Sequence, residues 1–447
     1  MNTAENSQRL KGFAGSIFNA GISALDPKSC ITRHLQLADG DFRVGKTFFS
    51  LKKIKKLYLV GAGKASAAMA AEVETLLGDR IDAGLVISKY GHGVPLRRCR
   101  VMEAGHPIPD ENGVKATRAL LDLIATAGPE DMILCMISGG GSALTPAPVK
   151  GISLAEKQEA TRLLLACGAT IHEINTVRKH LSRIKGGHFC RRANGARIVS
   201  LILSDVIGDN LDIIASGLTA PDPSSFGDCI GILSRYGLLD RIPESVRYHL
   251  AAGCKGDENE TPKPGDAVFA RVTNRIIGSV SDALFAAECE ARGLGFNPLI
   301  LSSMIQGEAR EVAKVLAAIA GEVRRSGRPI PAPACLLSGG ETTVTLKGGG
   351  KGGRNMELAL AAGIALSGVP HILILSAGTD GSDGPTDAAG GFADGSTVTR
   401  ADGIGLSASG HLAGNDAYPF FQRLGDLFIT GPTRTNVMDL QIVLIDS

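Results

Sequence analysis

Short apolar runs alternate with longer segments of helical hydrophobic spacing along most of the chain. The runs at 57–60, 132–137 and 371–376 are rich in Leu, Ile and Val, and glycine-rich or polar stretches follow them. Segments such as 307–326 instead repeat apolar residues at the spacing of one helix face. This alternation predicts an α/β protein with mainly parallel or mixed sheets.

The predicted elements fall into two groups. In the first group the expected strands are 57–60, 84–88, 132–137 and 198–204, and the expected helices are 64–77, 111–126, 153–167, 171–187, 224–236 and 243–252. In the second group the expected strands are 275–280, 298–302, 334–338, 342–346, 371–376, 427–430 and 440–445, and the expected helices are 281–293, 307–326 and 354–367. This order favours a Rossmann-like first lobe and a second α/β lobe.

A polar, proline-bearing stretch separates the two groups. Residues 253–266 read GCKGDENETPKPGD and show no apolar periodicity, which is typical of a linker. We therefore predict an N-terminal domain over 1–252, a linker over 253–266 and a C-terminal domain over 267–447. A surface loop inside one domain is the alternative. A Ser-Gly-Gly sequence follows a predicted strand in each lobe, so we expect an active-site cleft between the lobes.

Composition narrows the class of protein. Among 447 residues, 47 Lys and Arg face 45 Asp and Glu, and the net charge of +2 argues against a protein that coats nucleic acid or an acidic membrane. No apolar run reaches the about 18 residues of a membrane span, and we expect no signal peptide because the N-terminus lacks an apolar core. Nine cysteines without CxxC spacing favour a reduced, cytoplasmic setting.

The first candidate site is a GAGK turn after the strand at 57–60. Gly61 and Gly63 resemble the start of a dinucleotide fingerprint, but Ser66 stands at the third glycine and Ser88 near the position of the ribose-binding acid. What remains is a turn with outward amides and Lys64 at a helix N-terminus, which favours an anion. A capped turn with a solvated lysine is the alternative.

Two further glycine-rich loops can bind phosphate. In KGGGKGGRN, Arg354 is nearest the helix start and best placed to grip a transferring phosphoryl group; an unspecific basic loop is the alternative. In SGGGS, which follows the strand at 132–137, glycines allow several amides to approach an oxyanion, and a flexible turn is the alternative. The phosphate-binding residues predicted in SGGGS are Ser138, Gly139, Gly140, Gly141 and Ser142.

Acidic residues follow other predicted strands. Asp205 is a candidate general base or metal ligand. Asp380 and Asp383 lie in a loop rich in Gly and Pro, where aspartates either hold Mg²⁺ together with substrate phosphates or form Asx turns. With Asp209, they are the predicted Mg²⁺ ligands.

A basic segment coincides with the predicted helix 171–187. His172, Arg178 and Lys185 are placed to line a cleft for an anionic substrate, and a solvated helix face is the alternative. Glu341, which follows the second Ser-Gly-Gly, joins them as a candidate substrate-binding residue.

These features together favour phosphoryl transfer. That reaction needs amides that cradle phosphates, cations for the equatorial oxygens and carboxylates for Mg²⁺. A serine hydrolase of the α/β type would show a G-x-S-x-G elbow, which the chain lacks. A zinc enzyme would need ligand spacings that are also missing.

The motifs resemble those of the ATP-dependent glycerate 2-kinases of the two-domain class, whose C-terminal domain is called MOFRL. The matching blocks are GAGKAS, ISGGGSAL, HEINTVRKHLSRIKGG, SDVIGD with the IASG that follows it, SGGETTVT, GGRN, AGTDGSDGPTDAAG and GPTRTNVMDL. They keep their order from about residue 57 to residue 445. The resemblance implies transfer of the γ-phosphoryl group of ATP to the 2-hydroxyl of D-glycerate, with Mg²⁺. Members have also been called hydroxypyruvate reductases, so an NAD(P)H-dependent reductase is the alternative.

The resemblance also implies roles for single residues. Lys64 and Arg354 match the family's essential cations and would stabilise the moving phosphoryl group, while Asp205 would position the 2-hydroxyl or Mg²⁺. The ATP phosphates would lie against the 138–142 loop, and a homodimer is the candidate assembly. The chain departs from the family pattern at four positions, none of which removes a charge that the mechanism needs. These positions are Leu218, Met356, Arg434 and Met438.

Overall fold

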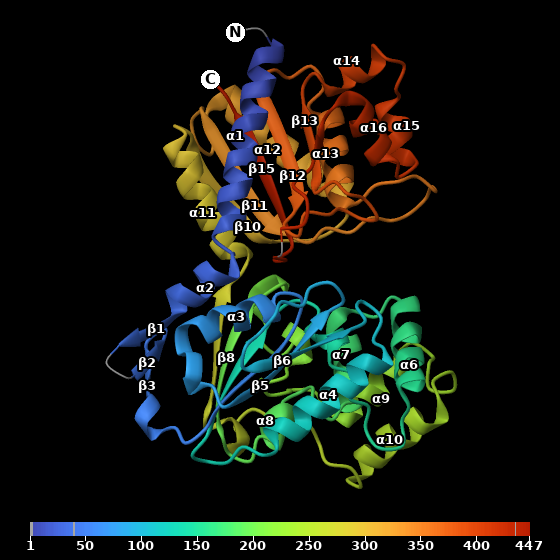
Figure 1. Ribbon diagram of the computed structural model, residues 1–447. Helices are drawn as coiled ribbons and strands as arrows, with labels where there is room; N and C mark the ends of the chain where they lie inside the picture. The colour runs from blue at the N-terminus through green and yellow to red at the C-terminus, as the bar shows by residue number, and fades with distance from the viewer. Residues whose placement is uncertain (1–2, 39–40, 434) are drawn as a thin grey trace. The chain divides into compact units, whose positions relative to one another are not determined.

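The computed structural model describes residues 3–38, 41–433 and 435–447, and it contains two compact units (Figure 1). Unit 1 comprises Met1–Asp26 and Gly278–Ser447, and unit 2 comprises Pro27–Ile277. The chain therefore passes from one unit to the other twice. Each unit is built on its own 6-stranded sheet.

Unit 2 has a largely parallel sheet in the order β6-β5-β4-β7-β8-β9. All pairings from β6 through β8 are parallel. Along β4, Leu59 packs into the apolar cluster of α3 and Val60 into that of α4, as expected for a strand buried on both faces. The strands are β4 (Leu57–Ala62), β5 (Ala83–Lys89), β6 (Cys99–Ala104), β7 (Met132–Ile137), β8 (Arg197–Leu203) and β9 (Val272–Gly278).

Helices cover both faces of this sheet, and a further group of helices has an apolar cluster of its own. The helices of unit 2 are α2 (Pro27–His34), α3 (Ser66–Leu77), α4 (Glu111–Ile124), α5 (Gly141–Leu144), α6 (Leu154–Ala166), α7 (Ile171–His180), α8 (His188–Arg192), α9 (Phe226–Arg235) and α10 (Glu244–Lys255). Short 3₁₀ turns include η3 (Ile207–Asp209) and η4 (Ile214–Ser216). A small antiparallel sheet comprises β1 (Leu35–Ala38), β2 (Asp41–Val44) and β3 (Thr47–Ser50).

Unit 1 has a mixed sheet in the order β10-β11-β15-β12-β13-β14. The strands are β10 (Asn297–Ile305), β11 (Ala334–Gly340), β12 (Ile372–Gly378), β13 (Gly390–Asp394), β14 (Leu427–Phe428) and β15 (Asp439–Ile445). β15 runs antiparallel to both of its neighbours, β11 and β12. The last strand of the chain is therefore inserted into the middle of the sheet.

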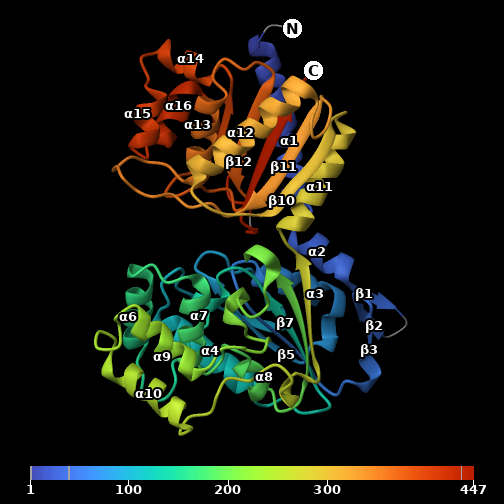
Figure 2. The same cartoon turned by 180° about the vertical axis from the view of Figure 1, so that it is seen from behind.

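Figures 1 and 2 show α1 and α12 on opposite faces of the unit 1 sheet. One face carries α12 and α13 with a shared apolar cluster, and α1 packs with α11, β12 and β15. The helices are α1 (Thr3–Ser23), α11 (Val280–Gly293), α12 (Ala309–Ser326), α13 (Arg354–Ala365), α14 (Thr397–Asp402), α15 (Ala408–Ala413) and α16 (Ala417–Leu424).

The structure confirms the predicted α/β class with parallel and mixed sheets. The expected strand at 342–346 is irregular except for a bridge between Glu308 and Thr343, because its three threonines leave no continuous apolar side to bury. The expected helix at 171–187 ends at His180, and the chain then turns through Gly186 and Gly187 with positive φ. The pattern missed β6 and β13, which carry polar residues or glycines in place of an apolar run.

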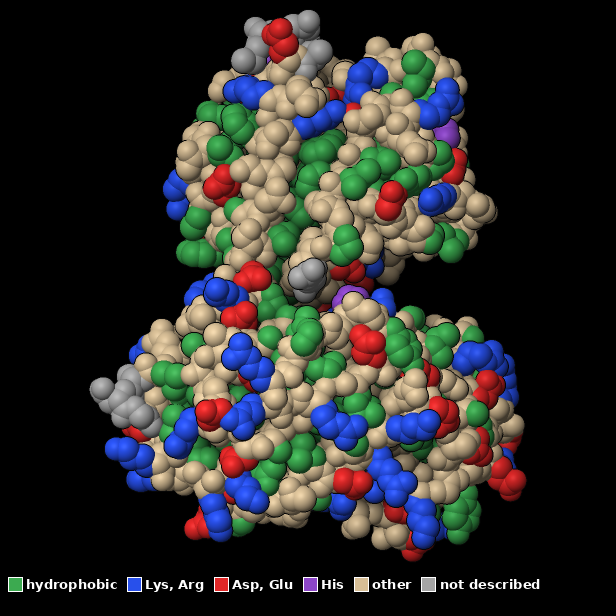
Figure 3. All heavy atoms as spheres, viewed as in Figure 1, with side chains coloured by type: hydrophobic (Ala, Val, Ile, Leu, Met, Phe, Trp, Pro, Cys, Tyr) green, Lys and Arg blue, Asp and Glu red, His purple; other side chains and the backbone are tan. Residues whose placement is uncertain are grey.

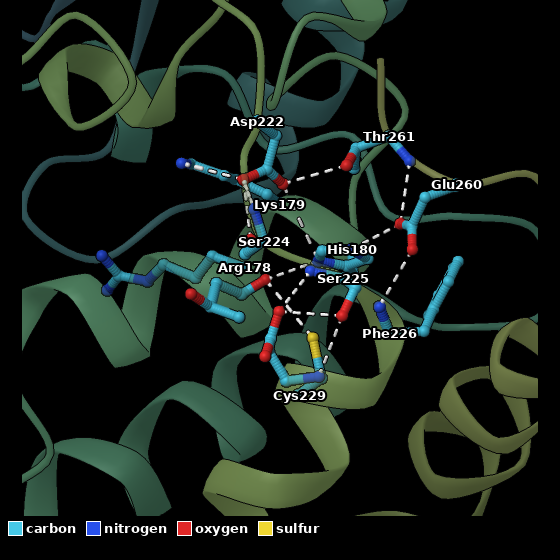
Figure 4. Close-up of polar contacts among 12 residues, drawn as sticks. Arg178, Lys179, His180, Asp222, Ser224, Ser225, Phe226, Cys229, Glu260 and Thr261 are labelled. Atoms are coloured by element: carbon cyan, nitrogen blue, oxygen red, sulfur yellow. Dashed lines mark hydrogen bonds and ion pairs between the residues drawn. The ribbon is translucent and has the colours of Figure 1, made fainter. Parts of the chain in front are cut away.

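The compact units divide the chain elsewhere than at the predicted linker 253–266. That segment lies inside unit 2, where Glu260 Oε1 lies 2.7 Å from His180 Nε2 and accepts a hydrogen bond from the Thr261 amide (Figure 4). Thr261 is buried and donates its hydroxyl to Asp222 at 3.0 Å. The segment reads as a linker because its anchors are polar side chains, which leave no hydrophobic pattern in the sequence.

The N-terminal helix is the second difference from the predicted domains. α1 belongs to unit 1, although the whole of unit 2 separates it in sequence from the rest of that unit. Ser16 donates to Glu290 of α11 at 2.6 Å, and Lys11 pairs with Asp426 at 2.5 Å. The first helix of the predicted 1–252 domain therefore packs with the sheet formed by the C-terminal half of the chain.

Surface charge in unit 2 is mixed. Over the face seen in Figure 3, Lys and Arg side chains alternate with Asp and Glu, without a broad region of one sign. None of the helices in the described ranges combines the length and the apolar character that crossing a bilayer requires.

Candidate functional site

The order of strands in unit 2 reverses next to β4. β5 and β6 extend the sheet on one side of β4, and β7 and β8 extend it on the other. In open α/β sheets, ligands bind at such a point, just beyond the carboxyl ends of the strands. The loop with Lys64 follows β4, and the loop with Ser138 follows β7. The topology therefore brings the predicted GAGK and SGGGS loops side by side.

These two loops are joined by hydrogen bonds. The Lys64 amide donates to the Gly139 carbonyl at 2.9 Å, and the Ala65 amide donates to Ser138 Oγ at 3.0 Å. A methyl group on Gly63, whose φ is +143°, would lie 2.1 Å from Ser138 Oγ. Only glycine permits this approach, so the loops form one rigid platform. The Ser138 hydroxyl faces Ala65 and Ser66, and it therefore serves the platform itself.

The platform carries an excess of positive charge. A methyl group on Gly140 would lie 2.8 Å from the His106 ring and 3.5 Å from Lys64 Cγ. Burial, followed by the charges of Lys64 and Lys89, lowers the pKa of His106 to about 4. Burial and the same two lysines also lower the pKa of His92. Within the described chain, the Lys64 ammonium has no carboxylate partner, so it is available to an anion.

A strained turn closes the other side of the 138–142 loop. Ala215 and Ser216 adopt φ of +50° and +57°, a region that non-glycine residues rarely occupy outside functional sites. The buried Ser216 hydroxyl lies 2.7 Å from Ser142 Oγ and donates to Asn175 Oδ1 at 3.0 Å. Sequence reasoning missed Ser216 and Asn175; the signal was their position inside two of the blocks that resemble the family.

The basic residues predicted to bind substrate differ in their surroundings. Lys185 is buried and donates to the Ser142 carbonyl at 2.6 Å, so it supports the loop. His172 is exposed on α7. Arg178 is half-buried, burial lowers its pKa, and its guanidinium has no ion pair with any described residue. Of the three, Arg178 is the side chain best suited to bind an anionic substrate.

Two aspartates follow β8. A methyl group on Gly139 would lie 2.4 Å from Asp205 Oδ2, which places that carboxylate directly against the platform. Asp209 adopts φ of +55°, and its buried Oδ1 atom has no hydrogen-bond partner among the described residues. Mg²⁺ is typically bound through one or two carboxylates plus substrate phosphates, and an unsatisfied carboxylate oxygen fits that requirement. The described chain holds no group of three His, Cys, Asp or Glu side chains that could hold a metal alone.

In unit 1, Arg354 is held by two acids. Arg354 Nε and Nη2 lie 2.6 and 3.0 Å from the two oxygens of Asp439, and Nη1 lies 2.9 Å from Glu341. Asp439 reaches this position because β15 pairs it with Gly340 and Gly378, at the carboxyl ends of β11 and β12. Burial lowers the pKa of Arg354, but the contacts with Asp439 outweigh it and raise the pKa above the ordinary value. Glu341, predicted to bind substrate, is thus ion-paired with the predicted catalytic cation Arg354.

The other predicted Mg²⁺ ligands are engaged in local structure. Asp383 accepts hydrogen bonds from the amides of Asn355 and Met356 at the start of α13, and burial raises its pKa to about 7. Asp380 accepts two hydrogen bonds from Ser382 in a tight turn. Asp380 and Asp383 belong to unit 1, whereas Asp209 belongs to unit 2.

The departures from the family pattern are accommodated locally. Leu218 and Met356 are buried in the apolar clusters of their units. The Met438 carbonyl accepts a hydrogen bond from the Thr379 amide at 2.9 Å. Arg434 lies outside the described residues.

Comparison with known proteins identifies the family. Residues 13–251 match the domain of unknown function DUF4147, and residues 334–439 match the MOFRL family. A D-glycerate 2-kinase of Thermotoga maritima is 45% identical over 98% of this chain and 99% of its own length. A glycerate 2-kinase of Pyrococcus horikoshii is 42% identical over 100% of this chain and 98% of its own. A protein of Agrobacterium vitis with a provisional hydroxypyruvate reductase name is 42% identical over 96% of this chain and 93% of its own.

Solved structures show the same relationship. The crystal structure of a glycerate kinase from Thermotoga maritima superposes with a TM-score of 0.87 at 42% identity, covering 98% of this chain and all of the other. The PH0495 protein of Pyrococcus horikoshii gives a TM-score of 0.85 at 40% identity, covering 98% of this chain and 99% of the other. The chain therefore belongs to the glycerate kinase family that combines a DUF4147 domain with a MOFRL region.

Proposed function

We propose that this protein transfers the γ-phosphoryl group of ATP to the 2-hydroxyl of D-glycerate, giving 2-phosphoglycerate and ADP. The observation that carries the proposal is the platform at the strand-order reversal of unit 2, where Lys64 stands over the glycine-rich 138–142 loop without a carboxylate partner in the described chain. The glycerate kinase names of relatives that match nearly the whole chain support the same reaction.

The 138–142 loop is the proposed site of the ATP phosphates. The amides of Gly139 and Gly140 take no part in the backbone hydrogen bonds of the described residues, so they can donate to phosphate oxygens. Lys64 adds a point charge beside them. Mg²⁺ would be held by Asp209 together with the nucleotide phosphates, and it would neutralise part of their charge.

Asp205 and Arg178 are the proposed contacts of the acceptor. The Asp205 carboxylate lies against Gly139 and can accept the proton of the 2-hydroxyl as that oxygen attacks the γ-phosphorus. Arg178 lacks an anionic partner among the described residues and can bind the glycerate carboxylate through two parallel hydrogen bonds. Arg354, fixed by Asp439 in unit 1, is the second cation that we propose the reaction requires.

The test is incubation of the full chain with ATP, MgCl₂ and D-glycerate, followed by enzymatic discrimination of 2-phosphoglycerate from 3-phosphoglycerate. We expect Lys64→Met to lower kcat by about 10²–10³, the usual loss when a group that stabilises transition-state charge is removed. Lys115→Met, at an exposed position on α4, is the matched control. A product phosphorylated at position 3, or full activity of Lys64→Met, would overturn the proposal.

The reductase alternative is tested in the same preparation. Oxidation of NADH or NADPH with hydroxypyruvate as acceptor would support it, and Ser66 and Ser88 argue against it because the dinucleotide fingerprint is incomplete there. We further propose a cytoplasmic location, in keeping with nine free cysteines. A homodimer is the proposed assembly, and light scattering of the purified chain tests it.

A further inference from the structure

Unit 2 contains a second cavity lined by basic side chains, which we call the basic pocket. Its volume is about 370 Å³. Its cationic wall comes from Arg183, Arg191 and Arg192, His188 adds a polar ring, and its apolar wall includes Leu121 and Phe226. The pocket thus lies among α4, α8, α9 and the segment after α7 (Figure 1). No residue of the platform formed by the β4 and β7 loops lines it.

The basic pocket is lined by more positively charged than negatively charged side chains. Arg183 and Arg192 are exposed, and neither guanidinium has a hydrogen bond or ion pair with a described residue. Arg191 donates to the Glu260 carbonyl at 3.2 Å, and its nearest carboxylate oxygen is 4.0 Å away on Asp266. The one acidic residue that lines the pocket is Glu258, whose Oε1 lies 3.6 Å from Nδ1 of His249. Among the lining residues three arginines face one carboxylate, and the nearby Asp222 and Glu260 are paired with Lys179 and Lys263. The cavity is therefore attractive to an anion.

Histidines complete the polar side of the pocket. His188 is half-buried, and burial together with Arg191 lowers its pKa to about 4. Its ring is therefore neutral near pH 7 and can donate one hydrogen bond without adding charge. His180 and His249 pack edge-on against Phe226, with ring centroids 4.7 and 5.6 Å away, and form the buried floor of the pocket. Figure 4 shows His180 near Phe226. The floor is held in place by Glu260, which pairs with His180 at 2.7 Å.

We propose that the basic pocket is a binding site for a phosphate dianion, either free or carried as a phosphate monoester. Two unpaired guanidiniums provide the planar, paired donors that match phosphate oxygens. The apolar side chains of Leu121 and Phe226 can contact the organic part of a small monoester. The site is separate from the proposed ATP site, since it shares no lining residue with the platform.

The test is isothermal titration of the full chain with inorganic phosphate and, in a second arm, with glycerol 2-phosphate. Lys64 also attracts phosphate, so every pocket variant is made both in the wild-type chain and in a chain that carries Lys64→Ala. All of these proteins are titrated in parallel. We expect one binding event to persist in Lys64→Ala and to weaken about tenfold or more in Lys64→Ala/Arg183→Ala/Arg192→Ala, as for the loss of charge-assisted hydrogen bonds. The arm with the higher affinity identifies the form of phosphate that the pocket prefers.

The controls separate binding from folding and from general charge. Arg183 and Arg192 are exposed, so the melting temperature without phosphate should be unchanged in the variants. Lys64→Ala/Arg100→Ala, which removes an exposed arginine on β6 outside the pocket, should bind as Lys64→Ala does. Arg183→Lys/Arg192→Lys should retain part of the affinity. Loss of all binding in Lys64→Ala, or equal binding after removal of both pocket arginines, would overturn the proposal.

Discussion

The pair of Arg354 and Asp439 in unit 1 joins a candidate catalytic cation to a fully buried carboxylate. The Asp439 side chain has an exposed fraction of 0%, against 34% for Arg354. Two hydrogen bonds of 2.6 and 3.0 Å connect them. Truncation of the arginine would leave the carboxylate in the protein interior without its cation. Breaking a buried ion pair in this way costs about 3–5 kcal/mol.

We therefore expect Arg354→Met to lower the free energy of unfolding of unit 1 by about 3–5 kcal/mol. The double variant Arg354→Met/Asp439→Asn should recover much of that loss, because a neutral amide avoids a buried charge. The deficit should also depend on pH. Burial raises the pKa of Asp439, whereas the contacts with Arg354 lower it. Removal of Arg354 therefore raises the pKa of Asp439 further. A carboxyl with a raised pKa in the folded state loses stability as pH rises through that pKa, so the deficit should shrink in acid.

The measurement is the urea dependence of hydrogen exchange in peptides of β15, which reports the unfolding of unit 1 separately from that of unit 2. It is made at one acidic pH and at one near-neutral pH, so that the direction of the pH dependence is tested. Arg324→Met, at an exposed position of α12, is the matched control. A loss below about 1 kcal/mol in Arg354→Met, or no recovery in the double variant, would refute the assignment of a buried, charge-dependent pair.

Three further outcomes test unit 2. Ser216→Ala should destabilise it by about 1–3 kcal/mol and lower kcat, since Asn175 loses its buried donor; urea unfolding and the kinase assay measure this. Burial lowers the pKa of Lys157 to about 7, so the unfolded chain binds more protons and stability should rise from about pH 7 to about pH 10. Lys157→Met should reduce that rise in denaturation curves taken across this window, and Lys185, whose pKa is also lowered by burial, should maintain the rest. Glu260→Gln should weaken the contact that anchors residues 253–266 to His180. Limited proteolysis should then cleave this segment faster than in the wild type.

Local patterns in the sequence were sufficient for much of the fold. Apolar runs located the strands that are buried on both faces, such as 132–137, because such strands have no polar side. Glycine-rich stretches marked the loops after β4 and β7, since only glycine allows the close approach of Gly63 to Ser138. Lys64 and Arg354 are therefore candidate phosphoryl-binding cations on the basis of residue type and position in the sequence alone.

Other features depend on contacts between distant parts of the chain. Arg354 meets Asp439 across 85 residues because β15 enters the sheet between β11 and β12. Ser216 meets Asn175 across 41 residues. Neither pairing leaves a periodic signal, since each involves single polar residues whose partners are chosen by packing.

What the sequence determined by itself was the set of local elements and the loops that hold glycines and cations at strand ends, because hydrophobic periodicity and backbone freedom are properties of neighbouring residues. The tertiary structure decided which carboxylates have oxygens left for a ligand. It engaged Asp383 at the start of α13 and left an oxygen of Asp209 without a partner in the described chain. It also joined α1 to the C-terminal sheet. These contacts depend on which apolar surfaces can be buried and which hydrogen bonds can be formed at the same time. Both depend on residues far apart in the sequence, so they are fixed only when the whole chain has folded.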